Sequence, residues 1–187
     1  MNYYSFPNVL TSFRIIMIPV VILLMYLPGK LTDILAVSLF FIVCVTDFLD
    51  GYIARAWQQT SSLGRFLDPI ADKLLVASIL LVLVELNRVN GLSLLPAMII
   101  LCREILVSGL REFLAELQVP VPVSRLAKWK TALQMLALGC LVMDPSSLPE
   151  IPLHELGIGG LWCAALLTLF TGYDYFKAGI ERVVQPG

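Results

Sequence analysis

Four aspartates near the middle of the chain have the spacing of a site for divalent cations. Asp47 and Asp50 are three residues apart and Asp68 and Asp72 are four apart, so each pair shares one face if its segment is helical. Clustered carboxylates raise one another's pKa and cannot all stay ionised without nearby cations. Oxygen ligands suit Mg²⁺ or Mn²⁺, and two such ions would clamp a phosphoryl group between the attacking and leaving oxygens. The spacing therefore predicts metal-dependent phosphoryl transfer.

Small and basic residues accompany the aspartates. Gly51 and Gly64 remove side chains where a helix or a nucleotide must approach closely. Arg55 is suited to neutralise a diphosphate. The alternative is that the acids only form structural ion pairs with Arg55, Arg65 and Lys73. Four acids in one short stretch favour the metal site.

Membrane helices must position these residues, because the chain is too apolar for an ordinary soluble domain. Hydrophobic residues make up 58% of the 187 positions and charged residues 14%, against about 45–50% and about 25% in soluble domains. A transmembrane helix takes about 20 residues, and a backbone in lipid must satisfy its own hydrogen bonds. We predict one all-α integral membrane domain over residues 1–187, with six transmembrane helices at about 8–27, 31–57, 65–87, 92–117, 124–143 and 158–180.

The distribution of basic residues predicts the orientation of these helices. One set of helix ends carries Arg55, Arg65, Arg111, Arg125, Lys128, Lys130, Lys177 and Arg182. The opposite set offers Lys30 and Arg88, and the stretch 144–157 contains acids but no Lys or Arg. Since Lys and Arg concentrate in cytoplasmic loops, we expect both termini to be cytoplasmic. A net charge of −1 also argues against nucleic acid as a partner.

The stretch from Asp47 to Asp72 resembles a known family motif. It reads D-x2-D-G-x2-A-R-x8-G-x3-D-x3-D without a departure, as in the CDP-alcohol phosphatidyltransferases. The resemblance implies a six-helix membrane enzyme that uses a CDP-linked lipid and an alcohol, and releases CMP at a two-metal site facing the cytoplasm. It also implies that Asp47, Asp50, Asp68 and Asp72 bind the metals and that Asp72 is the catalytic base.

The same resemblance places a nucleotide site beside the metals. Its CDP-binding positions correspond to Gly51, Ala54, Arg55 and Gly64. Asn8, Thr11 and Arg14 recur every three residues on the first expected helix and so lie near one face. We expect Asn8 and Thr11 to border the CDP pocket, although a helix cap after a proline explains Asn8 equally well.

Segments outside the motif indicate the acceptor alcohol. The runs 6–14, 103–113 and 128–135 resemble bacterial family members that join CDP-diacylglycerol and sn-glycerol 3-phosphate. An anionic acceptor needs cations near the metal site, and a charged residue within a membrane helix usually marks function. The predicted glycerol-phosphate-binding residues are Arg103, Arg111, Arg125, Lys128, Thr131 and Gln134.

Several alternatives stay open at this stage. Arg103 could simply pair with Glu104 or a neighbouring helix, and Arg125 and Lys130 could only satisfy the positive-inside rule. The acceptor could be inositol phosphate or phosphatidylglycerol, and rival functions are a cation transporter or a structural membrane protein. The resemblance further implies a homodimer among the lipids of a bacterial inner membrane.

Overall fold

The computed structural model describes residues 6–57, 62–117 and 125–184, which form six α-helices and one short 3-10 helix. In chain order these are α1 (Phe6–Tyr26), α2 (Lys30–Trp57), α3 (Ser62–Glu85), η1 (Gly91–Ser93), α4 (Leu94–Glu116), α5 (Arg125–Val142) and α6 (Leu153–Val184). The all-α prediction is confirmed over the described residues. Most helix boundaries lie within a few residues of the expected ones.

The largest difference lies at the start of α6, which begins at Leu153 instead of near residue 158. The Pro152 carbonyl accepts a hydrogen bond from the Leu156 amide at 3.0 Å, which closes the first turn. Glu155 lies in that turn, where a carboxylate interacts favourably with the helix dipole. The glycine-rich sequence up to Gly160 favoured a loop, but it continues the helix.

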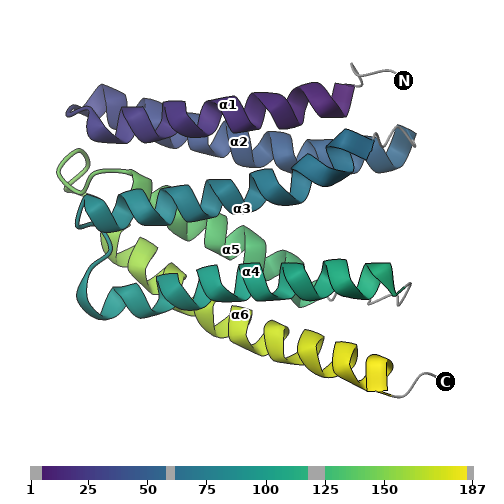
Figure 1. Cartoon of the computed structure of the whole chain (residues 1–187). Helices are drawn as coiled ribbons and strands as arrows, with labels where there is room; N and C mark the ends of the chain where they lie inside the picture. Colours follow the sequence, from purple (N-terminus) through teal and green to yellow (C-terminus); the bar gives the residue numbers. More distant parts are fainter. Residues whose placement is uncertain (1–5, 58–61, 118–124, 185–187) are drawn as a thin grey trace.

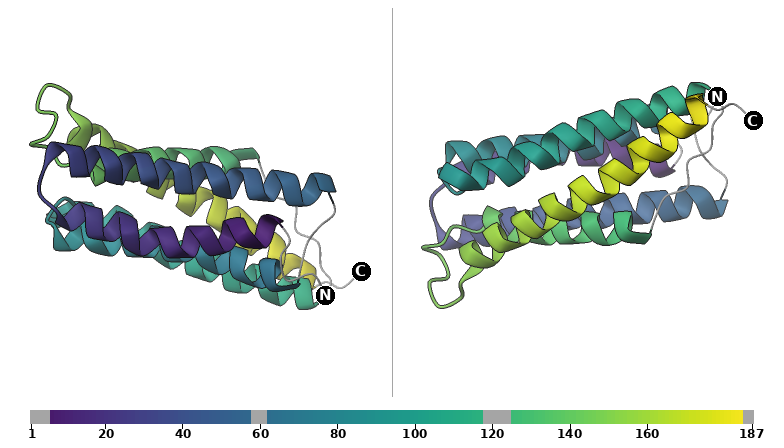
Figure 2. Two further views of the ribbon diagram at one scale, coloured as in Figure 1. Left: turned by 90° about the horizontal axis from the view of Figure 1, so that it is seen from above. Right: turned by 90° about the horizontal axis from the view of Figure 1, so that it is seen from below.

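The six helices lie side by side along a common direction, with α6 running obliquely across the bundle (Figure 1). The closest packing joins α5 with α6, α1 with α2, α4 with α6 and α1 with α3. The start of α1 and the end of α6 lie at the same end in all views (Figures 1 and 2). We name this end, where α2 ends and α3 begins, the motif end. The opposite end holds segments 27–29, 86–93 and 143–152, and we name it the loop end.

Glycines let α5 and α6 approach closely. A Cβ atom at Gly157 would lie 2.6 Å from Leu141 Cγ, and one at Gly160 would lie 2.9 Å from Ala137 Cβ. Small residues allow this kind of close backbone approach between helices in membranes. The contact fixes the rotation of α5 about its axis, which decides the side chains that α5 turns inward.

The outer surface of the bundle is strongly apolar. Large exposed hydrophobic side chains occur on all six helices, among them Ile16, Leu31, Leu81, Met98, Leu136 and Phe170. Soluble proteins rarely expose contiguous apolar surface of this kind. Within the described residues, Gly91–Glu116 and Leu153–Lys177 are long and apolar enough to cross a membrane, and Leu10–Tyr26 and Trp129–Val142 are shorter apolar helices.

Candidate active site

A buried arginine on α1 joins the two halves of the aspartate motif. Arg14 Nη1 lies 2.6 Å from Asp47 Oδ1 on α2 and 2.7 Å from Asp72 Oδ1 on α3. The Arg14 side chain is 0% exposed, whereas those of Asp47 and Asp72 are 40% and 48% exposed. We name these three residues the Arg14 cluster. The cluster shows that one acid from α2 and one from α3 lie close together, as the motif predicted for this pair.

The packing of α1 explains why Arg14 points inward. The buried residues of α1 follow one another at spacings of three and four, which places them on a single face. They are Thr11, Arg14, Ile18, Val21 and Met25. Thr11, predicted to border the nucleotide, is therefore an interior residue one turn from Arg14. The sequence pattern contained Arg14, but its role as partner of the motif acids was not foreseen.

The remaining residues predicted to bind the metals or CDP lie outside the part of the chain whose side chains the structure describes. These residues are Asn8, Asp50, Gly51, Ala54, Arg55, Gly64 and Asp68. No group of three or more His, Cys, Asp or Glu side chains converges among the described residues. The full set of four aspartates therefore stays a prediction, with Asp47 and Asp72 brought together.

The described pair of acids fits the chemistry of a hard divalent cation. Because one nitrogen contacts both Oδ1 atoms, these atoms are separated by no more than the two distances added together, 5.3 Å. Carboxylates this close can ligate the same ion or two adjacent ions, which lie about 3.5–4 Å apart in two-metal sites. Oxygen donors without nitrogen or sulfur ligands favour Mg²⁺ or Mn²⁺ over zinc.

A second group of polar side chains lies in the interior between α4, α5 and α6. Glu104 Oε1 accepts a hydrogen bond from Lys130 Nζ and lies 3.4 Å from Arg103 Nη1. Arg103 Nη2 lies 3.3 Å from Thr171 Oγ1 on α6. The Lys130 side chain is 3% exposed. We name Arg103, Glu104, Lys130 and Thr171 the α4–α6 polar network. Gln134 is buried on α5 one turn after Lys130.

Part of this interior offers hydrogen-bonding atoms that the described residues do not satisfy. Arg103 Nε, Gln134 Oε1 and Thr168 Oγ1 are buried without a hydrogen-bond partner among them. Buried polar atoms in proteins are usually paired, and exceptions call for a water, an ion or a ligand. The network therefore has cations and, in Arg103 Nε, a spare donor, as expected of a site for a small anion.

The predicted acceptor residues are only partly brought together. Arg103 lies in the α4–α6 polar network, where it also makes the Glu104 contact that was its structural alternative. Gln134 is buried on α5 one turn after Lys130. Arg111 is exposed, with its guanidinium 5.8 Å from the Tyr175 ring centroid. Thr131 is exposed on α5. The side chains of two further candidates, Arg125 and Lys128, lie outside the described ones.

Sequence reasoning missed several interior polar residues. Lys130 was not in the predicted acceptor set, and the positive-inside rule was one explanation left open for it, yet it is buried four residues before Gln134. Both continue the buried apolar face of α5 formed by Ala137, Leu138 and Leu141. That extended stripe is the signal that identifies the inward face. Lys73 on α3, which directly follows the motif, also donates a hydrogen bond to Ser108 Oγ on α4.

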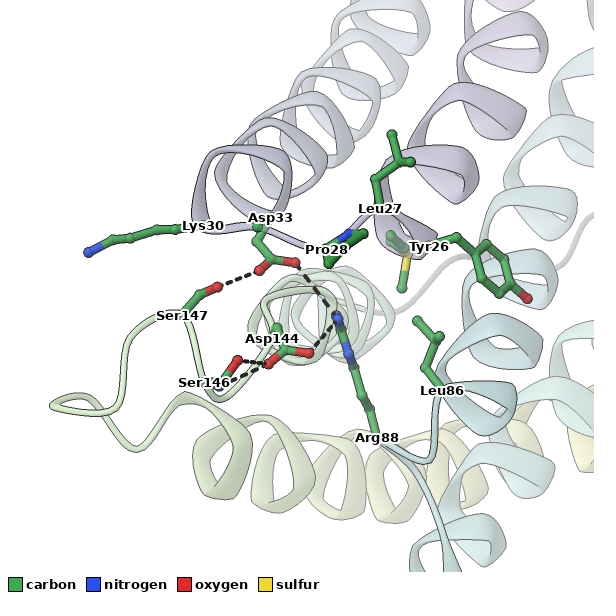
Figure 3. A pocket seen from close by; sticks show the side chains of 12 residues that line it. Tyr26, Leu27, Pro28, Lys30, Asp33, Leu86, Arg88, Asp144, Ser146 and Ser147 are labelled. Carbon is green, nitrogen blue, oxygen red and sulfur yellow. Dashed lines mark hydrogen bonds and ion pairs between the residues drawn. The ribbon is translucent and has the colours of Figure 1, made fainter.

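A hollow among the described residues lies at the loop end, away from the motif acids (Figure 3). Its volume is about 490 Å³, and its wall contains a second buried arginine, Arg88. Arg88 Nη2 lies 3.0 Å from Asp144 Oδ2 and 3.7 Å from Asp33 Oδ1. We name Arg88, Asp33 and Asp144 the Arg88 cluster.

Hydrogen bonds from the polypeptide enclose the Arg88 cluster. Ser147 Oγ donates to Asp33, and the Ser146 amide and hydroxyl donate to Asp144 (Figure 3). Arg88 also donates to the Val142 carbonyl. The Ser146 hydroxyl, aided by its amide and by Arg88, holds the pKa of Asp144 below its ordinary value. These contacts join α2, the 86–93 segment and the 143–152 segment, so we interpret the cluster as a structural link between them.

Comparison with known proteins identifies the family. Residues 4–170 match the family CDP-alcohol phosphatidyltransferase. A Rickettsia typhi protein is 50% identical over 174 residues, covering 93% of this chain and 96% of its own length. Proteins from Haemophilus influenzae and Pectobacterium atrosepticum are 42% and 37% identical, and the matches cover 93% and 98% of this chain and 92% and 99% of theirs. All three are named CDP-diacylglycerol--glycerol-3-phosphate 3-phosphatidyltransferase.

Proposed function

This chain belongs to the CDP-alcohol phosphatidyltransferase family, and we propose that it transfers the phosphatidyl group from CDP-diacylglycerol to sn-glycerol 3-phosphate, giving phosphatidylglycerophosphate and CMP. The main support for this proposal is that relatives up to 50% identical over 93% of the chain are named for this reaction. The Arg14 cluster supports it, because it gathers acids from both halves of the motif.

The proposed reaction is an in-line displacement at phosphorus. The glycerol 1-hydroxyl attacks the lipid-linked phosphorus, a new P–O bond forms, and the P–O bond to the CMP phosphate breaks. Asp72 takes the proton of the attacking hydroxyl, and its half-exposed side chain is accessible for this role. CMP leaves with the electron pair of the broken bond.

Two Mg²⁺ or Mn²⁺ ions are proposed to be held by Asp47, Asp50, Asp68 and Asp72. When bound, they polarise the diphosphate and balance the charge of the leaving oxygen. The oxygen-only donor set and the closeness of Asp47 to Asp72 support this assignment. The CDP moiety is proposed to lie against Asn8, Thr11, Gly51, Ala54, Arg55 and Gly64.

The acceptor phosphate is proposed to bind at the cationic residues of α4 and α5. Arg103 carries the proposal, since its buried Nε is a donor without a partner among the described residues, whereas Gln134 Oε1 is an acceptor suited to the glycerol hydroxyls. Arg111, Arg125, Lys128 and Thr131 complete the candidate set, and the buried Lys130 joins it. Arginine and lysine hydrogen bonds to phosphate are charge-assisted and comparatively strong.

We further propose six membrane spans with both termini and the motif end on the cytoplasmic side of a bacterial inner membrane. The apolar outer surface and the shared end of α1 and α6 support the spans (Figure 1). The bias of Lys and Arg toward the motif end supports the orientation. A homodimer is proposed from the family resemblance.

The decisive experiment is CMP release by the purified protein in detergent with CDP-diacylglycerol and Mg²⁺. We expect release with sn-glycerol 3-phosphate and its loss on adding a chelator. Inositol phosphate, serine and phosphatidylglycerol serve as competing acceptors in parallel reactions. Release with one of these alone would keep the family chemistry and overturn the acceptor, whereas no release from folded protein would favour a transporter or structural role.

A further inference from the structure

We propose that Arg14 is a positioning residue that holds Asp47 and Asp72 in the arrangement that binds divalent cations. This inference rests on the proposed function, since it concerns the metal site of the same reaction. Arg14 acts through the two carboxylates and does not itself contact the reacting atoms.

The geometry of the Arg14 cluster supports a permanent structural contact. A single atom, Arg14 Nη1, contacts both carboxylates, at 2.6 Å and 2.7 Å. Charge-assisted hydrogen bonds of this length are stronger than neutral ones. The three residues come from three different helices, so the arginine fixes α2 and α3 to each other through α1. Local helix geometry alone does not provide this link.

Burial separates the role of Arg14 from that of its partners. Its side chain is 0% exposed and belongs to the inward face of α1 with Ile18 and Val21. It is therefore shielded from a substrate that enters from water or lipid. Asp47 and Asp72 are 40% and 48% exposed, so they present carboxylate surface outward while their Oδ1 atoms contact the arginine.

Arg14 is therefore placed to orient the two carboxylates as metal ligands without contacting the metal itself. Groups that hydrogen-bond to ligating carboxylates fix their orientation, and their loss typically costs about 10–100-fold in metal affinity. The competing explanation is charge compensation, in which Arg14 only neutralises the acids until a metal replaces it. The two explanations predict opposite changes in metal affinity when Arg14 is replaced. Loss of a positioning residue would weaken metal binding, whereas loss of a competing cation would strengthen it.

The experiment measures Mn²⁺ binding to metal-stripped full-length protein in detergent by electron paramagnetic resonance, without substrates. We expect Arg14→Gln to weaken Mn²⁺ binding by about 10–100-fold. Arg14→Lys keeps the charge but lacks the planar fork of donors, and we expect it to restore part of the affinity. The matched control is Arg88→Gln, which removes a buried arginine that also contacts two aspartates. It should leave Mn²⁺ affinity unchanged.

Circular dichroism and gel filtration identify variants that fold. If Arg14→Gln does not fold, Arg14→Lys still tests the proposal. If the guanidinium positions the carboxylates, Arg14→Lys must bind Mn²⁺ more weakly than the natural protein. Unchanged or tighter binding in a folded Arg14 variant would overturn the positioning role. Failure of the unaltered protein to bind Mn²⁺ would instead overturn the proposed metal site, so the two failures are distinguishable.

Discussion

The two ends of the bundle are each organised around a buried arginine that bridges two aspartates. At the motif end, Arg14 contacts Asp47 and Asp72. At the loop end, Arg88 contacts Asp144 and lies within ion-pair distance of Asp33. Both clusters bring together elements far apart in the sequence. Their chemistry nevertheless differs.

The difference lies in what surrounds the carboxylates. Asp33 is 5% exposed and accepts a hydrogen bond from Ser147, while Asp144 is engaged by Ser146 as well as by Arg88. The polypeptide thus encloses the Arg88 cluster with its own donors. The acids of the Arg14 cluster are both at least 40% exposed and lie in the aspartate motif between residues 47 and 72.

Under the proposed function, the same arrangement of one arginine and two aspartates serves stability at the loop end and chemistry at the motif end. An ion pair completed by serine hydroxyls and backbone groups leaves little capacity for a ligand. An ion pair that holds one oxygen of each of two accessible carboxylates leaves their other oxygens available to a ligand. Charge alone does not distinguish the two clusters, but exposure and the identity of the other donors do.

The largest expected contrast between the clusters is in turnover after removal of one aspartate charge. Asp72→Asn cannot accept the proton of the attacking hydroxyl, so we expect kcat to fall by about 10²–10⁴-fold. Asp144→Asn should leave kcat unchanged, because Asp144 lies at the opposite end. CMP release by folded variants provides the measurement. Near-natural turnover in Asp72→Asn would remove Asp72 from the role of base.

The second contrast is in stability, and it has the opposite direction. Arg88→Gln leaves the buried Asp33 without its cation, and breaking a buried ion pair costs about 3 kcal/mol or more. For a chain of this size, that corresponds to a fall in Tm of about 6–12 °C. Thermal unfolding in detergent measures this shift, and turnover below the transition should match the natural protein. A normal Tm would contradict the role of the Arg88 cluster as a structural link.

The sequence predicted the helices and the motif acids because both depend on local information. Apolar segments of sufficient length define the helices, and spacings of three and four place acids on one face. The partners of Asp47 and Asp72 were not predictable in this way, since Arg14 lies 58 residues from Asp72 and pairs with it only through helix packing.

The inward face of α5 illustrates the same limit. Thr131 and Gln134 were both predicted to bind the acceptor, but Thr131 is exposed, whereas Lys130 is buried with Gln134. The rotation of α5 is set by its close contact with Gly157 and Gly160 on α6. Long-range packing therefore decides which of the possible faces of α5 points into the bundle.

A smaller contrast compares Arg103 in the interior with an exposed cation at the loop end. Arg103→Gln removes a charge from the α4–α6 polar network, and hydrogen bonds to charged groups contribute about 1.5–3 kcal/mol. We expect the KM for sn-glycerol 3-phosphate to rise about 10-fold or more, with little change in the KM for CDP-diacylglycerol. The control, Lys30→Gln, removes an exposed cation at the loop end and should change neither constant. Equal increases for both substrates in Arg103→Gln would overturn the acceptor assignment.

The smallest expected effect is a pH dependence of stability at Asp144. Its pKa is lower in the folded protein because Ser146, and secondarily Arg88, favour the charged carboxylate. The stabilisation is therefore complete above the unfolded pKa of about 3.9, and it is lost as the pH falls through the lower folded value. Since the Asp144 side chain is 38% exposed, solvent screens the interaction and the effect on Tm should be modest.

Comparing thermal unfolding of the natural protein and Asp144→Asn at several pH values tests this dependence. The variant should melt lower at pH 7, and the difference should shrink below about pH 4. Ser146→Ala removes the largest cause of the shift and should reproduce part of the loss. Glu150→Gln, which changes an exposed carboxylate in the same segment, should melt like the natural protein. A difference that persists at low pH would mean that Asp144 stabilises the loop end through packing and not through its charge.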